Sequence, residues 1–196
     1  DGKELPTGRR LITVREDLTD VRGRHESRLS QIKSEELASA VVIAKGRNAL
    51  LTMTPAEARS AEFLADFNGL VNQLDGEIKA IESGKDPYVG MTGDYWRQLS
   101  VGKVNIPCRV FAPAGLTAES QPPLFVVLHG AGGDENMFMD AYGMGAIKRV
   151  AETKRAVVVS PATTSMTIRK DALPALIDEM SRCYGIDRKR VYVLGH

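Results

Sequence analysis

The 196-residue sequence has little of what metal, nucleic-acid and membrane sites require. Its three histidines and two cysteines are scattered without ligand spacing, so we expect no metal site and no cofactor. The 26 basic and 25 acidic residues are interspersed and leave a net charge of +1, so no basic stripe indicates nucleic acid. No apolar run approaches the roughly 18 residues that a membrane span needs. We therefore expect neither nucleic acid nor a membrane as a partner.

The few cysteines leave the redox compartment open. Cys108 and Cys183 are either two buried thiols or one disulfide, and spacing alone does not decide between them. The first residue is Asp1 rather than Met, which favours the removal of an N-terminal segment. We expect a secreted or periplasmic protein, with a cytoplasmic one as the alternative.

The first half of the chain predicts helices. Residues 1–24 are polar and broken by proline and glycine, so we expect a lead-in arm, and His25 beside it is expected to be solvated. Residues 25–94 form a helical N-terminal segment with one helix over 26–45. A second helix begins at the capping box of residues 54–57 and ends at 83–84.

The second of these helices carries a long apolar stripe, which requires a packing partner. The stripe fits a helical hairpin packed on itself and on the rest of the protein. The alternatives are a cap over an active site or a dimerisation surface, which would make the protein a homo-oligomer through its N-terminal helices.

The second half, residues 95–196, predicts an α/β domain. Residues 96–101 and 104–111 alternate as a β-hairpin around Gly102, and Pro107 places the second strand near the sheet edge. From residue 123 the order is strand, helix, strand, helix, strand, which predicts a parallel sheet with crossover helices. The expected strands are 123–128, 156–161 and 190–195, and the expected helices are 146–152 and 167–183.

A glycine turn follows the first of these strands. The five apolar residues Leu124–Leu128 predict a buried central strand, and His129-Gly130-Ala131-Gly132-Gly133 comes directly after it. Glycines leave backbone N–H groups open to a ligand that carries negative charge. A dinucleotide cradle would need glycine where Glu135 stands, and no Gly-Lys-Ser/Thr follows for a P-loop. A purely structural turn is the other alternative.

The glycine turn and the ending Gly195-His196 together resemble the α/β-hydrolase fold, over residues 95–196. Within that fold the sequence looks most like bacterial esterases of the polyhydroxybutyrate-depolymerase, feruloyl-esterase and dienelactone-hydrolase-like group. The resemblance implies a mostly parallel sheet flanked by helices, preceded here by the helical segment. It also implies a serine nucleophile directly after His196, with the catalytic acid and base further along. We expect residues 95–196 to be the first part of a hydrolase domain that continues, because a bare apolar edge at 190–195 would invite aggregation.

The resemblance also assigns residue roles. The backbone amides of Ala131 and Gly132 would form part of the oxyanion hole. Met137 and Phe138 are candidates for an acyl pocket, with plain packing as the alternative. The residues expected to hold the motif's structure rather than react are His129, Gly130, Gly133, Gly195 and His196.

The function implied is hydrolysis of a small-molecule carboxylic ester through an acyl-enzyme intermediate. A serine peptidase of the prolyl-oligopeptidase type is one alternative, although such enzymes usually carry a β-propeller before the hydrolase domain. The other alternative is a non-catalytic binding protein that kept the fold and lost the chemistry.

Overall fold

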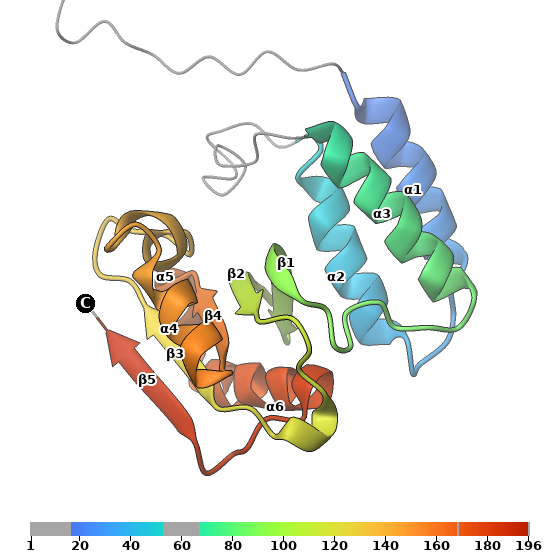
Figure 1. Cartoon of the computed structure of the whole chain (residues 1–196). Helices are drawn as coiled ribbons and strands as arrows, with labels where there is room; N and C mark the ends of the chain where they lie inside the picture. Colours follow the sequence, from blue (N-terminus) through green and yellow to red (C-terminus); the bar gives the residue numbers. More distant parts are fainter. Residues whose placement is uncertain (1–16, 53–66, 168, 196) are drawn as a thin grey trace, which may run out of the picture.

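A bundle of three helices stands beside an α/β body (Figure 1). The structure, a computed structural model, describes residues 17–52, 67–167 and 169–195. The bundle consists of α1 (Thr19–Gln31), α2 (Ala38–Ala49) and α3 (Phe67–Glu82). The body contains the strands β1 (Gly93–Val101), β2 (Val104–Ala112), β3 (Leu124–Leu128), β4 (Val157–Pro161) and β5 (Val191–Gly195). Its helical elements are η2 (Ala118–Ser120), the π-helical η3 (Met137–Ala141), α4 (Ala146–Lys154), α5 (Thr163–Met166) and α6 (Ala172–Tyr184).

The single helix expected over 26–45 is wrong, because two helices occupy this region. α1 starts at Thr19, inside the range expected as an arm, and ends where Ile32 turns to an extended conformation. The polar residues 33–36 then separate α1 from α2, so that the chain reverses and apolar residues of both helices face α3. The remainder of the expected arm, residues 1–16, and the capping box at 54–57 lie outside the described residues.

The apolar stripe of α3 is buried within the chain. Its residues Leu70 and Leu74 pack with Trp96 of β1, whereas Ile78 and Ile81 pack with α1 and α2. This is the arrangement expected for helices packed on themselves and on the body. Burial of such side chains contributes about 1.5–3 kcal/mol each, so the stripe accounts for much of the bundle's cohesion.

His25 is buried rather than solvated, so that expectation is wrong. The ring is 3% exposed, with Nδ1 3.0 Å from Asn48 Oδ1 and Nε2 3.3 Å from Asp75 Oδ1. Its partners come from α2 and α3, which the sequence places 23 and 50 residues away. The interhelical hydrogen bonds compensate the burial of a polar ring.

The sheet is mixed, in the order β1-β2-β4-β3-β5. The expected hairpin is confirmed: β1 and β2 pair antiparallel, with Val101 opposite Val104. β2 also pairs antiparallel with β4, whereas β3 pairs parallel with β4 and with β5. The α/β class is therefore shown, but "mostly parallel" overstates the parallel share, because the hairpin adds its strands antiparallel.

β2 lies near the sheet edge, as predicted from Pro107, because it is next to the edge strand β1, but it pairs on both sides, with β1 and with β4. The Pro107 carbonyl accepts a hydrogen bond from the Ala162 amide (2.8 Å), just beyond the last residue of β4. In an antiparallel ladder the N–H and C=O of one residue point to the same neighbour. The missing N–H of Pro107 therefore falls at the end of the β2–β4 ladder, where little is lost.

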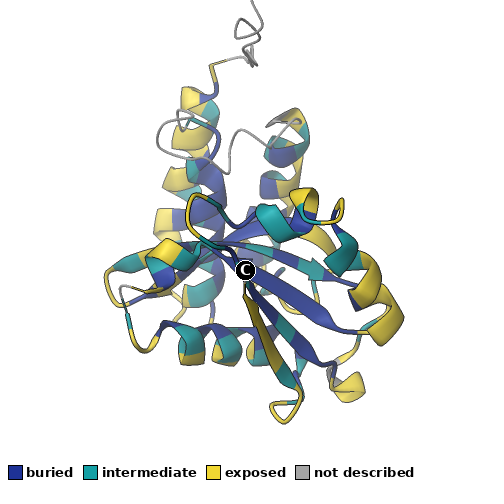
Figure 2. Cartoon of the chain, turned by 90° about the vertical axis from the view of Figure 1, so that its left-hand side faces the viewer, coloured by how far each residue is buried: buried dark blue, intermediate teal, exposed yellow. Residues whose placement is uncertain are grey.

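Helices cover both faces of the sheet. On one face, Val127 and Val158 pack with Met139 of η3 and Ala151 of α4. The other face, larger, packs against α6; its cluster includes Ile106, Val110, Val126, Val159, Leu176 and Met180. The outer strand β5 differs, because Tyr192, Val193 and Leu194 are 50%, 51% and 41% exposed (Figure 2). No helix among the described residues is long and apolar enough to cross a membrane.

The two cysteines are free, buried thiols, so the disulfide alternative is wrong. Cys108 lies in β2 and Cys183 in α6, both within the larger apolar cluster. Burial raises the pKa of the Cys108 thiol to about 12. Burial likewise raises the pKa of Cys183, against the opposing effect of Arg97. Both cysteines are therefore packing residues held in the thiol form.

A partly buried carboxylate joins the bundle to the body. Glu179 of α6 forms an ion pair with the buried Arg97 of β1 and accepts a hydrogen bond from Arg182 (2.8 Å). Ser39 of α2 also donates to Glu179, over 3.1 Å. Burial by itself would raise the pKa of Glu179, but the hydrogen bond from Arg182 and the charges of Arg97 and Arg182 lower it to about 2. The cluster borders a cleft of about 450 Å³ between α2, β1 and α6.

This lowered pKa predicts that the protein loses stability in acid. Unfolded, Glu179 takes up a proton near its ordinary pKa of 4.5, but folded it stays charged down to about pH 2. The contribution is therefore fully present above pH 4.5 and is lost as the pH falls toward 2, by at most roughly 3 kcal/mol. Urea denaturation of the wild type and of Glu179→Gln across pH 2–6 measures it, with Asp178→Asn controlling for the loss of one negative charge. Equal pH dependence in the wild type and Glu179→Gln would contradict the assignment.

Candidate active site

The carboxyl ends of β3 and β5 lie side by side. The two strands are parallel, and Leu128, the last residue of β3, is opposite Gly195, the last residue of β5. The glycine turn leaves β3 at this edge of the sheet. His196 lies outside the described residues, so its role stays a prediction. The register thus brings the two motifs of the sequence, the turn and Gly195, to one place.

His129 holds the start of the turn. The ring is 5% exposed. Its Nδ1 lies 2.9 Å from the Gly130 carbonyl, and its Nε2 lies 2.9 Å from the amide of Thr163 at the start of α5. Because a carbonyl only accepts and an amide only donates, the proton is on Nδ1 and Nε2 accepts. Both ring nitrogens thus contact the backbone, which is compatible with the structural role predicted for this residue.

Two positions of the turn favour glycine for different reasons. The Gly133 amide closes the turn on the Gly130 carbonyl (3.2 Å). Gly132 has φ +82°, a left-handed conformation that costs other residues about 1–2 kcal/mol. A Cβ at Gly133 would stand 3.1 Å from His129 Cβ and Nδ1, closer than ordinary contact. Glycine is therefore favoured at 132 by conformation, and at 133 a Cβ would crowd His129.

The turn exposes two backbone donors. Ala131 and Gly132 are both exposed at its tip. Within the described part of the chain, the N–H groups of these two residues donate to no hydrogen bond. Backbone amides that are held in place and open to solvent are the donors that stabilise a developing oxyanion. The geometry is compatible with the role predicted for Ala131 and Gly132, which remains a proposal.

A second anchor fixes the far end of the turn. Glu135 and Asn136 are each 2% exposed. Trp96 of β1 donates its indole N–H to Glu135 Oε1 over 2.9 Å, and Arg109 of β2 donates to Asn136 Oδ1 over 2.6 Å. The backbone N–H of Asn136 in turn donates to Asp134 Oδ1 over 2.9 Å. The hairpin β1–β2 therefore holds the end of the turn by side-chain contacts.

Sequence reasoning missed these anchoring residues. From the sequence, Glu135 was notable only because a dinucleotide-binding motif would need glycine at that position. Trp96 was notable only as the start of a strand. The signal available was weak: a carboxylate and an indole 39 residues apart. No local pattern links them, because the register of the hairpin against β4 brings them together.

The residues proposed to line an acyl pocket make packing contacts. Phe138 packs against the cluster of Val127 and Met139 and meets Tyr142 edge to face, with ring centroids 4.9 Å apart. Met137 is half-buried and approaches Gly133. These contacts are those of the plain-packing alternative, and a pocket role for Met137 and Phe138 stays a prediction.

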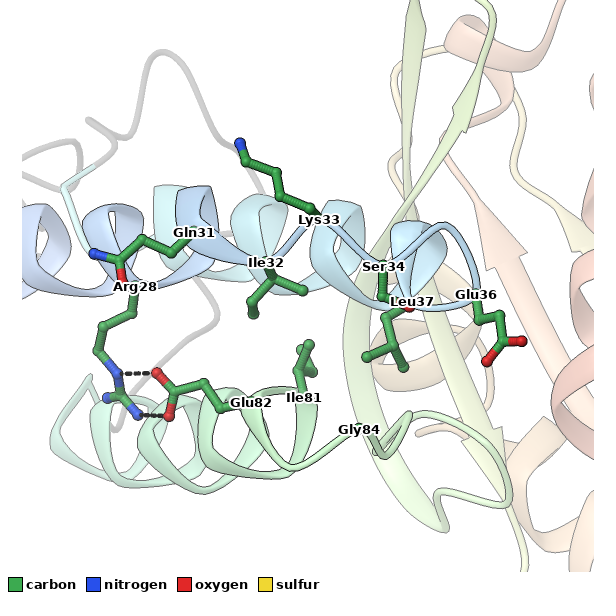
Figure 3. A pocket seen from close by; sticks show the side chains of 10 residues that line it. All are labelled: Arg28, Gln31, Ile32, Lys33, Ser34, Glu36, Leu37, Ile81, Glu82 and Gly84. Atoms are coloured by element: carbon green, nitrogen blue, oxygen red, sulfur yellow. Dashed lines mark hydrogen bonds and ion pairs between the residues drawn. The ribbon is translucent and has the colours of Figure 1, made fainter.

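A cleft of about 430 Å³ lies at the far end of the bundle, away from the turn's residues. Its walls come from the ends of α1 and α3 and the segment between α1 and α2 (Figure 3). Arg28 reaches across to Glu82 with two 2.8 Å hydrogen bonds, which lower the pKa of Glu82. Arg28 and Glu82 therefore satisfy each other. Among the described residues, no group of three or more His, Cys, Asp or Glu is placed to hold a metal ion.

No family model matches the sequence, and no curated protein does. The chain is similar to solved structures of esterases and serine hydrolases. S-formylglutathione hydrolase (FrmB) from Staphylococcus aureus is 16% identical, with a TM-score of 0.43, over 53% of this chain and 47% of that one. A CE1 ferulic acid esterase from the anaerobic fungus Anaeromyces mucronatus is 17% identical, with a TM-score of 0.39, over 56% of this chain and 53% of that one. The chain thus matches about half the length of each, and the likeness carries no argument about substrate.

The conformation of the turn predicts opposite effects of two glycine substitutions. Gly132→Ala should lower the free energy of unfolding by about 1–2 kcal/mol, because alanine is disfavoured at positive φ. Gly23→Ala should raise it by about 0.5–1 kcal/mol, because Gly23 lies inside α1 with nothing within 4 Å of the new Cβ. Urea denaturation of both variants checks the pair. A Gly132→Ala variant as stable as Gly23→Ala would contradict the turn geometry.

Proposed function

We propose that the protein is a serine hydrolase that cleaves carboxylic esters of small molecules through an acyl-enzyme intermediate. One observation carries the proposal: the exposed amides of Ala131 and Gly132, which donate to no hydrogen bond within the described residues, follow β3 beside the carboxyl end of β5. In the resembled fold, the nucleophile follows the strand that corresponds to β5 and lies next to such amides. We place the nucleophilic serine directly after His196.

The chemistry assigned to the described residues is electrostatic. The serine oxygen attacks the ester carbonyl, and the carbonyl oxygen takes on negative charge in the tetrahedral intermediate. The Ala131 amide, with Gly132 as the second candidate, donates to that oxygen. The alcohol then leaves, and water releases the acid from the acyl-enzyme. The proton transfers belong to an acid and a base that we expect after residue 196.

Of the two alternatives, the peptidase gains no support, because the described residues before β1 form helices rather than the strands of a propeller. The identity of the residue after His196 distinguishes the enzyme from the non-catalytic binding protein. A Ser-x-Gly sequence after His196 keeps the enzyme, whereas Ala or Gly in the first place favours the binding protein. A secreted or periplasmic location and assembly through the N-terminal helices stay predictions.

The proposal predicts covalent labelling at one position. An organophosphonate probe should react with the full-length protein at the residue directly after His196, because activated serines attack phosphorus as they attack an ester carbonyl. Peptide mapping by mass spectrometry locates the adduct. Replacement of that residue by alanine is the control and should abolish labelling. An adduct at another residue, or no adduct on the wild type, would refute the proposed function.

A further inference from the structure

Trp96 of β1 contacts both the helical bundle and the end of the glycine turn. Its indole ring is 5% exposed and packs against bundle residues that include Leu50 and Leu74. Its backbone carbonyl accepts a hydrogen bond from the buried Arg47 of α2. Its indole N–H donates to Glu135 Oε1. A displacement of the bundle against β1 would therefore displace the donor that Glu135 uses.

The Trp96–Glu135 contact carries weight because both partners are buried. A carboxylate that is 2% exposed has lost most of its hydration and depends on protein donors. A hydrogen bond to a buried acceptor is costly to lose, because no water replaces the donor. Removal of the indole N–H takes away one of the donors that fix Glu135. The end of the turn is then held less firmly, with the contact of Arg109 and Asn136 still in place.

The exposed amides lie between two anchors. His129 fixes the start of the turn, and Glu135 with Asn136 fixes its end, so only residues 130–134 lie between them. An oxyanion donor must lie about 2.7–3.1 Å from the developing charge. A misplacement of about 1 Å can cost on the order of 100-fold in rate. The position of the far anchor therefore bears directly on the amides of Ala131 and Gly132.

We infer that Trp96 and Glu135 are positioning residues for the glycine turn, and that through Trp96 the three-helix bundle sets the geometry of that turn. The inference rests on the proposed ester hydrolase function. Neither residue is assigned contact with the substrate; both act through the backbone of residues 130–134. The bundle thereby acts on the turn through the contacts of Trp96.

A double-mutant cycle in the full-length protein tests the inference, with p-nitrophenyl acetate as substrate. Trp96→Phe keeps an aromatic ring and removes the N–H, and Glu135→Met removes the acceptor. Each should lower kcat about ten-fold with KM within about two-fold, because the oxyanion forms only in the transition state. The double variant should be no slower than the slower single variant, since both break one contact. Glu135→Gln keeps an acceptor oxygen and should stay within about two-fold of the wild type.

A matched control separates positioning from loss of stability. Ile81→Ala opens a cavity in the bundle cluster that does not contain Trp96. It should lower the melting temperature while kcat stays within about two-fold of the wild type. Hydrogen exchange gives a readout besides activity: the peptide covering 129–136 should exchange faster in Trp96→Phe and at the wild-type rate in Ile81→Ala.

The outcomes are distinct. If the wild type hydrolyses the ester, a kcat for Trp96→Phe within about two-fold of the wild type overturns the inference. If the wild type does not react, the proposed function fails, and exchange alone decides the anchoring. Unchanged exchange across 129–136 in Trp96→Phe overturns the inference in either case.

Discussion

The burial of Trp96 at the joint between bundle and body is the constraint on which the rest of the structure depends. The Arg47 that reaches its carbonyl is itself buried and forms an ion pair with Glu77 of α3, with Arg47 Nη2 3.0 Å from Glu77 Oε1. Tyr88 donates to the same carboxylate over 2.7 Å, and burial, with the Glu77 charge, raises the pKa of Tyr88 well above its usual value. Breaking a buried ion pair typically costs about 3–5 kcal/mol. Arg47 therefore joins α2 both to α3 and to the backbone of β1.

The sheet carries this constraint to the candidate site. Pairing of β1 with β2 and of β2 with β4 places Trp96, Arg109 and Ser160 in one row on one face. Two members of the row bind the end of the glycine turn, Trp96 through Glu135 and Arg109 through Asn136. The hairpin thus does more than extend the sheet. It supplies the polar side chains that hold the chain as it leaves β3.

Features set by neighbouring residues could be predicted from the sequence, and features set by distant residues could not. The hairpin around Gly102 and the strands β3 to β5 follow from local patterns, whereas a structural role for His129 was implied only by the family resemblance. The break between α1 and α2, the burial of His25 and the anchoring of Glu135 depend on partners at least 23 residues away, or on how three helices pack. Periodicity does not contain that information, because it records which face is apolar and not what covers it.

The central claim is that a glycine turn held at both ends presents its amides to an oxyanion. The most direct measurement is a crystal structure of the full-length protein carrying a phosphonate adduct. The account predicts a phosphonyl oxygen about 2.7–3.1 Å from the Ala131 or Gly132 amide nitrogen, with Trp96 still bonded to Glu135. A phosphonyl oxygen bound by other donors, with residues 130–134 turned away from it, would contradict the account.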